Sequence, residues 1–270
     1  MIRLVICKND GESPSLPPSE SSPFTKNGRE RSKSDSVHAY LVLKNAYRIF
    51  YGEELPKIIK NEKGRPFFCK TVSPNFRENG QTQASFNFQE NGQTQAYCNS
   101  QENRQTQASF ENLRDFDFNI THTDGLCAVA FLSGNGRIGV DAECEKEVKN
   151  ADKIYERHLK NINKTLHNTL RDVEIFVTEL RNNSLEILGT VLVSELDFEK
   201  GVTLADGGAL SLSSDGFFTL WTLAESAVKA EGGGFESLRE VPKILERSHS
   251  LSLRYKTADG DRVISLCHLL

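Results

Sequence analysis

Strand-like patterns recur along the chain, either as alternating apolar and polar positions or as short apolar runs between turn residues. The clearest is 116–122, where Phe, Phe and Ile alternate with polar residues, which predicts a strand with one buried face. Turn residues at 123–125 and 134–136 bound the next two segments and predict an antiparallel meander over 116–143. Segments of this kind lie at 1–7, 64–68, 116–122, 126–131, 137–143, 250–255 and 261–268.

Apolar residues spaced three and four apart predict helices. The expected helices span 36–51, 152–180 in one or two pieces, and 217–230. Gly52 follows the first of these helices, and a run of three glycines follows the last. Residues 185–198 are apolar and partly β-branched, which indicates an added strand pair. Helices and strands mixed in both halves of the chain predict the α+β fold class.

Composition narrows the classes of function. The 270 residues are 37% hydrophobic and the mean hydropathy is -0.46, so we expect a sizeable part of the length to lie outside a core. The net charge of -4 argues against nucleic-acid and membrane-surface binding. No run approaches the ~18 apolar residues of a membrane span, and the first residues do not resemble a signal peptide. We therefore expect a cytoplasmic protein.

A twelve-residue repeat interrupts the pattern of strands. The sequence Glu-Asn-Gly-Gln-Thr-Gln-Ala begins at Glu78 and at Glu90, and returns from Glu102 with Arg104 in place of the glycine. Its polar residues offer little apolar surface to offset the entropy of ordering the chain. We predict a flexible insertion over 75–113, with a small stacked-turn structure as the alternative. A second insertion, without a recognisable motif, is expected between 150 and 215.

Two carboxylates mark the end of the predicted strand at 137–143. Asp141 and Glu143 are two positions apart, so they share one face of the strand with Gly139. We expect the missing side chain of Gly139 to leave room for a ligand. A hard cation such as Mg²⁺ would relieve the repulsion between two neighbouring carboxylates. The alternative is a solvated strand end.

A polar stripe runs along the predicted helix at 217–230. Trp221, Glu225 and Lys229 are spaced four residues apart and therefore lie on one side of the helix, beside the apolar stripe. Glu225 and Lys229 alone form the spacing of an ordinary exposed ion pair. Placed next to the strand carboxylates, they would extend an acidic site and supply it with a cation.

Four segments together resemble the 4′-phosphopantetheinyl transferase superfamily. The family motifs are a strand ending in Gly-Val-Asp-x-Glu, a helix of the form Trp-x-x-x-Glu-x-x-x-Lys-x-x-Gly, a Phe-Asn-Ile-Ser-His-Ser segment and a Gly-Lys-Pro tripeptide. In this chain the strand motif lies at 139–143 and the helix motif at 221–232. The segment similar to Phe-Asn-Ile-Ser-His-Ser lies at 118–123, and the tripeptide similar to Gly-Lys-Pro lies at 64–66. The length is similar to the single-chain members that activate peptide synthetases, so we expect a monomer.

The resemblance implies both fold and reaction. It implies two similar α/β subdomains, 1–132 and 133–270, related by a pseudo-twofold axis with coenzyme A in the cleft between them. It implies transfer of the 4′-phosphopantetheine arm of coenzyme A to a serine of an apo acyl or peptidyl carrier protein, with release of 3′,5′-ADP. Asp141, Glu143 and Glu225 would hold Mg²⁺, and Glu225, alone or through a metal-bound water, would be the general base for the serine.

The remaining site residues are also assigned through the resemblance. His122 and Lys229 would hold the pyrophosphate of coenzyme A, and Thr121 precedes His122 in the same motif. Arg65 replaces the lysine of Gly-Lys-Pro and could hold phosphate in a bidentate way. One or two of the basic residues at 26–33, with Lys33 as the candidate, would bind the 3′-phosphate.

One position departs from the family. Ala224 stands where the family has a lysine just before the helix glutamate, so a positive charge is missing. A charged hydrogen bond to phosphate contributes roughly 1.5–3 kcal/mol, enough to affect transfer. The departure keeps open a catalytically weak or inactive protein that binds coenzyme A or a carrier protein. A Mg²⁺-dependent phosphohydrolase on another fold is a third interpretation.

Overall fold

The computed structural model has an α+β fold, as the sequence predicted. It describes residues 1–8, 30–69, 83–88, 94–99, 116–162, 169–198, 201–205, 207–214 and 216–270. The helices are α1 (Glu30–Tyr51), α2 (Ala151–Ile154), α3 (Phe217–Glu231) and α4 (Val241–Glu246), and the short turns are π-helical η1 (Tyr155–Leu159) and 3₁₀ η3 (Val193–Glu195) and η4 (Phe235–Glu240). Within these described ranges, no helix is long and apolar enough to cross a membrane.

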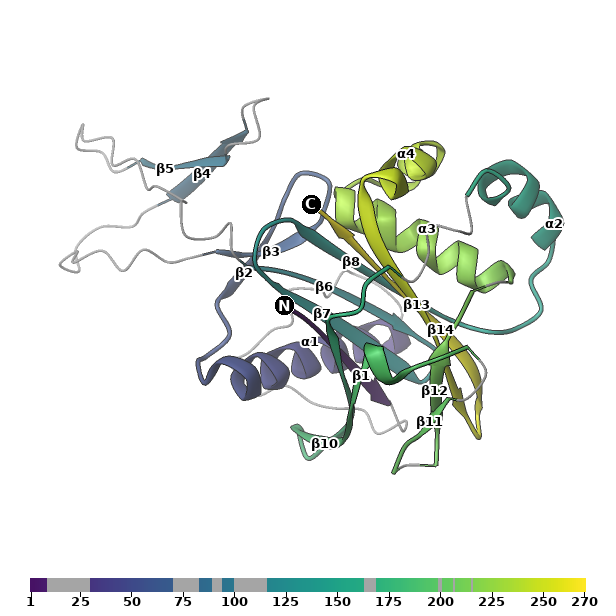
Figure 1. Cartoon of the computed structure of the whole chain (residues 1–270). Coiled ribbons are helices and arrows are strands. Elements are labelled where there is room, and N and C mark those ends of the chain that lie inside the picture. Colours follow the sequence, from purple (N-terminus) through teal and green to yellow (C-terminus); the bar gives the residue numbers. More distant parts are fainter. Residues whose placement is uncertain are drawn as a thin grey trace.

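Two five-stranded sheets dominate the fold (Figure 1). The first has the order β10 (Ser184–Leu192), β9 (Val173–Arg181), β1 (Ile2–Lys8), β7 (Leu126–Ser133) and β6 (Phe116–Thr123). The second has the order β11 (Val202–Thr203), β12 (Ala209–Leu212), β13 (Ser248–Thr257), β14 (Gly260–Leu269) and β8 (Arg137–Cys144). Two hairpins, β2 (Lys57–Lys60) with β3 (Pro66–Cys69) and β4 (Gln83–Phe88) with β5 (Thr94–Asn99), form separate two-stranded sheets.

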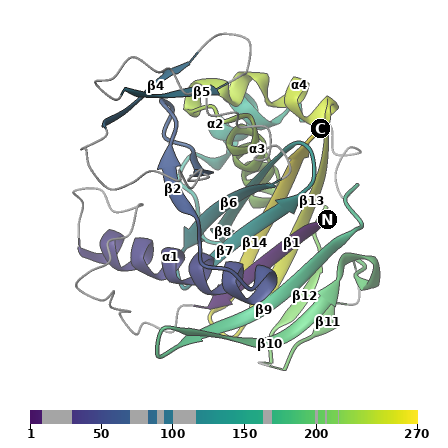
Figure 2. The same ribbon diagram turned by 90° about the vertical axis from the view of Figure 1, so that its left-hand side faces the viewer.

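The alternation of side chains sorts the apolar residues into layers. In β1, Leu4 and Ile6 belong to a central core that also includes residues of the second sheet, such as Val140. Val5 and Cys7, which point to the other face, pack with α1 instead. Figure 2 shows α1 lying across the strands of the first sheet. On the far side, α3 and α4 pack on the second sheet, so each sheet has one face on the central core and one face on a helix.

The antiparallel meander predicted over 116–143 is wrong for its third strand, because β6 pairs with β7 but β8 pairs with β14 of the second sheet. The two sheets meet where the edge strands β6 and β8 run side by side. Side chains of β6 make this junction: Asp117 accepts a hydrogen bond from the backbone N–H of Ile138 at 2.7 Å, and Asn119 accepts one from Val140 at 3.1 Å. Polar side chains at alternate positions of one strand thus take the place of a backbone ladder. The polar face of the predicted strand at 116–122 is the seam between the sheets.

The predicted helix at 152–180 is wrong over its second half. The residues from Val173 to Arg181 form β9, which pairs in parallel with β1, and residues 163–168 lie outside the described residues. Val173, Val177 and Leu180 fit a helical spacing, but Val173, Ile175 and Val177 also alternate, and all three are buried. Packing against β1 and the central core therefore decides for the strand. The strand pair predicted at 185–198 is wrong in part, because these residues contain one strand of the first sheet, β10, which ends at Leu192 and pairs with β9.

The predicted domain boundary and the predicted structure of the repeat region also differ from the observed fold. The first sheet takes β9 and β10 from beyond residue 133, so the boundary predicted at 132/133 does not separate the two sheets. In the repeat region, the expected insertion without regular structure is replaced, over 83–88 and 94–99, by the antiparallel pair β4 and β5. The other residues of 75–113 lie outside the described residues, and flexibility there stays a prediction.

Candidate functional site

Gly139 lets helix α3 lie directly on strand β8. A Cβ atom at Gly139 would lie 1.9 Å from the carbonyl oxygen of Ser226 and 2.6 Å from the backbone nitrogen of Ala230. The expectation that the space above Gly139 receives a ligand is therefore wrong, because the backbone of α3 fills it. The consequence for the site is close contact between the strand that carries Asp141 and the helix that carries Glu225 and Lys229.

An ion pair between Lys229 and Asp141 joins the helix to the strand. The ammonium Nζ of Lys229 donates to Oδ1 of Asp141 at 2.6 Å, to Oγ1 of Thr121 at 3.2 Å and to the carbonyl oxygen of Val140 at 3.2 Å. An ammonium group has three N–H donors, so these contacts use all of them. Asp141 is only 6% exposed, which makes a compensating cation necessary at neutral pH.

Asp141 has one oxygen that is already bound and one that is not. Oδ1 receives Lys229 and also the hydroxyl of Thr121, at 3.2 Å. Oδ2 is buried and has no hydrogen-bond partner among the described residues. An orphaned buried carboxylate oxygen is costly unless a ligand or ion satisfies it. This atom is the strongest local indication that a cation or a donor group binds beside Asp141.

Glu143 and Glu225 belong to the same electrostatic cluster. Burial raises the pKa of Glu225 above its ordinary value, and the negative charge of Asp141 raises it further, while Lys229 opposes the rise. Burial likewise raises the pKa of Glu143, and Asp141 adds to that rise. The sequence expectation that these carboxylates gather at one place, together with Lys229, agrees with this coupling.

The residues present suit a hard divalent cation in chemistry but do not form a finished ligand set. Carboxylate oxygens are what Mg²⁺ prefers, and raised carboxyl pKa values with an orphaned oxygen fit a site that a cation would stabilise. In the part of the chain that the structure describes, however, no group of three or more His, Cys, Asp or Glu side chains could hold a metal ion as arranged. The predicted Mg²⁺ site at Asp141, Glu143 and Glu225 stays a prediction.

Thr121 and His122 lie on opposite faces of β6. Thr121 is buried and bonds to both Asp141 and Lys229, so it belongs to the site. His122 is exposed, and its charge acts on His38 of α1, which packs on the other face of the first sheet. Consecutive strand residues point to opposite sides, so His122 faces away from the Asp141 carboxylate. Its predicted contact with phosphate stays a prediction.

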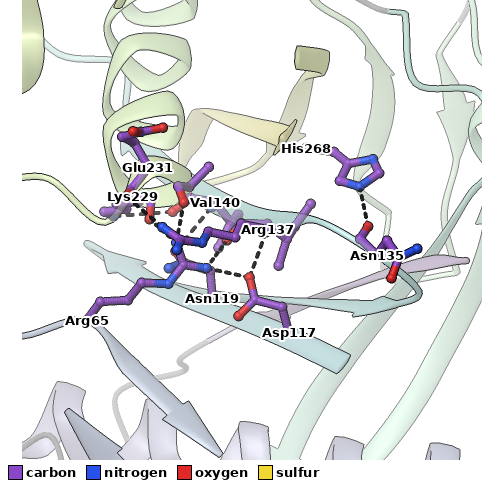
Figure 3. Close-up of polar contacts among 11 residues, drawn as sticks. Arg65, Asp117, Asn119, Asn135, Arg137, Val140, Lys229, Glu231 and His268 are labelled. Atoms are coloured by element: carbon purple, nitrogen blue, oxygen red, sulfur yellow. Dashed lines mark hydrogen bonds and ion pairs between the residues drawn. The ribbon is translucent and has the colours of Figure 1, made fainter. Parts of the chain in front are cut away.

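Arg65 binds protein groups. One guanidinium nitrogen, Nη1, donates to the carbonyl oxygens of Lys229, at 2.6 Å, and of Ala230. The other, Nη2, donates to the carboxylate of Asp117 and to the carbonyl oxygen of Ile138, at 3.1 Å (Figure 3). Burial raises the pKa of Asp117, and the neighbouring Arg65 opposes that rise. These contacts make Arg65 part of the junction between α3, β6 and β8.

Ala224 and Lys33, two further positions that the sequence analysis singled out, both lie in helices. Ala224 is 1% exposed and packs in the apolar cluster with Leu159 and Leu223, so a lysine here would have its stem in a core. The side chain at position 224, where the family has a lysine, therefore points into this apolar cluster and away from Asp141. Lys33 lies in the first turns of α1, and its side chain lies outside the described residues.

Sequence reasoning missed Asp117 and Asn119, which hold β8 in place. The sequence did contain a signal: Asp117 and Asn119 alternate with the apolar residues of β6 and therefore share a strand face with Thr121. Neither a family model nor a curated protein matches this sequence.

Proposed function

We propose that this protein transfers the 4′-phosphopantetheine arm of coenzyme A to a serine hydroxyl of an apo acyl or peptidyl carrier protein, releasing 3′,5′-ADP. The observation that carries the proposal is the meeting of Asp141, Glu143, Glu225 and Lys229 at the contact of β8 with α3. These residues come from two of the four motifs that carry the resemblance, the strand at 139–143 and the helix at 221–232. An ordinary exposed ion pair or a solvated strand end would not bury Asp141 with an unsatisfied oxygen.

The proposal includes a fold of two similar halves. What supports it is the like arrangement of α1 over β1, β7 and β6, and of α3 over β13, β14 and β8, with β6 and β8 meeting at the junction. Each set has three neighbouring antiparallel strands and one long helix. We propose that coenzyme A lies across this junction.

In the proposed reaction, Glu225 takes the proton of the carrier serine. The serine oxygen forms a bond to the β-phosphorus of coenzyme A, and the bond from that phosphorus to the bridging oxygen of the pyrophosphate breaks, so that 3′,5′-ADP leaves. A carboxylate whose pKa is raised toward neutrality is a better general base than an ordinary glutamate, and burial beside Asp141 has that effect on Glu225.

Asp141, Glu143 and Glu225 would hold Mg²⁺, which supplies charge neutralisation and polarisation of the pyrophosphate when bound. Lys229 contributes a positive charge to the same place and orients Asp141 through a hydrogen bond. Thr121 orients both partners through its hydroxyl. A phosphate oxygen that binds Lys229 must replace one of its three protein acceptors.

A second candidate function is binding of coenzyme A or of a carrier protein without efficient transfer. Two observations favour it: the described residues include no formed set of three metal-ligating side chains, and the donors of Lys229 are all used within the protein. The two candidates differ in one outcome, the covalent change of a carrier protein.

The test is incubation of the protein with coenzyme A, Mg²⁺ and a panel of apo carrier proteins, followed by intact mass measurement of the carriers. Transfer predicts that at least one carrier gains the mass of phosphopantetheine, on its serine. Calorimetry with coenzyme A in the same buffer identifies a binder. Binding with no modified carrier supports the second candidate, and neither binding nor modification overturns both.

A further inference from the structure

The motif Gly64-Arg65-Pro66 builds the tip of a short hairpin. Gly64 has φ of +83°, a left-handed conformation that favours glycine, and its N–H donates to the carbonyl oxygen of Asn61 at 2.8 Å. The side chain of Asn61 accepts the N–H of Arg65, also at 2.8 Å. Phe68, farther along the hairpin, stacks on Phe118 of β6 with ring centroids 4.2 Å apart. The hairpin therefore presents Arg65 from a fixed base on the first sheet.

The guanidinium of Arg65 reaches three different elements. Its acceptors are the carbonyl oxygens of Lys229 and Ala230 in α3, the carboxylate of Asp117 in β6 and the carbonyl oxygen of Ile138 in β8 (Figure 3). Asp117 itself also accepts the N–H of Ile138. The planar fork of an arginine suits such divergent acceptors, whereas a lysine ammonium is a single point. The Arg65 side chain is only 10% exposed, so these contacts are shielded from water.

The contact with α3 falls at the C-terminal end of the helix, where the carbonyl oxygen of Lys229 also accepts the N–H of the capping Gly232 at 3.2 Å. The last carbonyls of a helix carry partial negative charge, which a cation stabilises. Gly232 caps α3 with φ of +79°, and a Cβ there would lie 3.5 Å from Cδ of Arg65. The hairpin tip thus closes the C-terminal end of α3.

Lys229 connects this end of the helix to the candidate site. Its carbonyl oxygen accepts from Arg65, while its own ammonium donates to Asp141. A shift of the last turn of α3 would move both ends of this residue together. Glu225, one helical turn earlier on the same stripe, would follow.

We propose that Arg65 is a positioning residue, which fixes the last turn of α3 against β6 and β8 and so sets where Lys229 and Glu225 stand. This role differs from the phosphate contact expected from the sequence, since both terminal nitrogens of Arg65 are engaged by protein oxygens. Only the kinetic consequence of the role rests on the proposed function. The structural role stands without it.

The test compares Arg65→Lys and Asp117→Asn with the matched control Arg137→Lys. Arg137 also donates to a carbonyl at the end of α3, that of Glu231 at 3.1 Å, but its side chain is exposed and makes this contact at the surface. Amide hydrogen exchange is measured across α3 in the free proteins, together with the fluorescence of Trp221, the sole tryptophan of the chain.

We expect exchange in the last turn of α3 to rise roughly ten- to hundredfold in Arg65→Lys, because charged hydrogen bonds are lost there. Asp117→Asn should change exchange in the same turn, and the double variant should fall short of the sum of the two effects, since both residues act through one contact. Arg137→Lys should leave exchange and fluorescence near wild type. Unchanged exchange in both Arg65→Lys and Asp117→Asn overturns the proposal.

Kinetics separate positioning from phosphate binding. A positioning role predicts that Arg65→Lys lowers kcat while the Kd for coenzyme A, measured by calorimetry, stays within about threefold of wild type. A phosphate ligand predicts the reverse: a weaker Kd with normal exchange in α3. Hydrogen exchange needs neither carrier nor transfer, so an inactive wild-type protein would contradict the proposed function and still leave the role of Arg65 testable. If Arg65→Lys does not fold, Asp117→Asn carries the same test.

Discussion

The ammonium of Lys229 lies 2.6 Å from Oδ1 of Asp141, and Oδ2 of the same carboxylate has no partner among the described residues. One side of Asp141 is thus neutralised by α3, and the other side is buried without compensation. This ion pair joins helix α3 to strand β8, although its two residues are 88 positions apart in the sequence. Its properties lead to expectations about stability, pH and catalysis.

Removing the ammonium group of Lys229 should destabilise the folded protein. Lys229→Met leaves Asp141 buried without its charged donor, and we expect the free energy of unfolding to fall by roughly 1.5–3 kcal/mol, the value of a charged hydrogen bond. Denaturant titration at pH 7 measures the change. Adding Asp141→Asn should recover part of the loss, because the unpaired charge is then absent. A double variant as unstable as the sum of both single changes would contradict the pairing.

Glu225 should destabilise the metal-free protein at neutral pH. Its folded-state pKa is raised by burial and by Asp141, so the folded protein holds the proton more tightly than the unfolded chain does. The contribution to stability is complete below the ordinary pKa of 4.5 and is lost as pH rises through the higher folded-state pKa. In chelator, Glu225→Gln should therefore gain stability relative to wild type as pH rises above about 4.5. Denaturant titrations at several pH values measure this, with exposed Glu246→Gln as control.

His38 predicts an opposite pH effect. Burial lowers its pKa below 6.5, the nearby His122 lowers it further, and Asp35 opposes the shift. The unfolded chain therefore binds the proton more readily, so stability falls as pH drops below 6.5 toward the folded-state pKa. His38→Gln should flatten this part of the stability curve. The exposed His249→Gln should not, and identical curves for wild type and His38→Gln would contradict the expectation.

Ala224→Lys should destabilise rather than restore a catalytic charge. Position 224 is 1% exposed in an apolar cluster, so a lysine must bury its ammonium or disrupt the packing of α3. We expect a drop in Tm of several degrees, consistent with a loss of about 1–3 kcal/mol. Lysine at the exposed Ala205 is the control. A variant with normal Tm and faster transfer would show that the position does reach the site.

Local patterns predicted where the strands lie in the chain, but they did not predict the sheet to which β8 belongs, because β8 pairs with β14 and not with β7. The segments that became β6, β7 and β8 alternate or are uniformly apolar and are joined by glycine-containing turns, so their boundaries agree closely with the sequence prediction. β9 was missed because its strand character depends on β1, more than a hundred and fifty residues earlier. Spacings of three and four residues coexist there with alternation, and only the distant partner decides between them.

The candidate site was partly predictable for the same reason. Strand geometry puts Asp141 and Glu143 on one face, and helix geometry puts Glu225 and Lys229 on one stripe, so two local rules define most of the chemistry. The role of Arg65 does not follow from local rules, because its acceptors belong to three elements that meet only in the folded chain. The space predicted above Gly139 for a ligand is occupied by the backbone of α3, a packing contact that the strand pattern alone does not reveal.

The most direct test of the proposed function is transfer to an apo carrier protein by wild type and by Asp141→Ala, measured by intact mass with Mg²⁺ and with excess chelator. Glu145→Gln, a carboxylate just beyond the same strand that is paired with Arg254, is the matched control. We predict transfer by wild type and by the control in Mg²⁺, and near-complete loss in chelator and in Asp141→Ala. Full-rate transfer by wild type in chelator, or unchanged turnover in Asp141→Ala, would contradict the account.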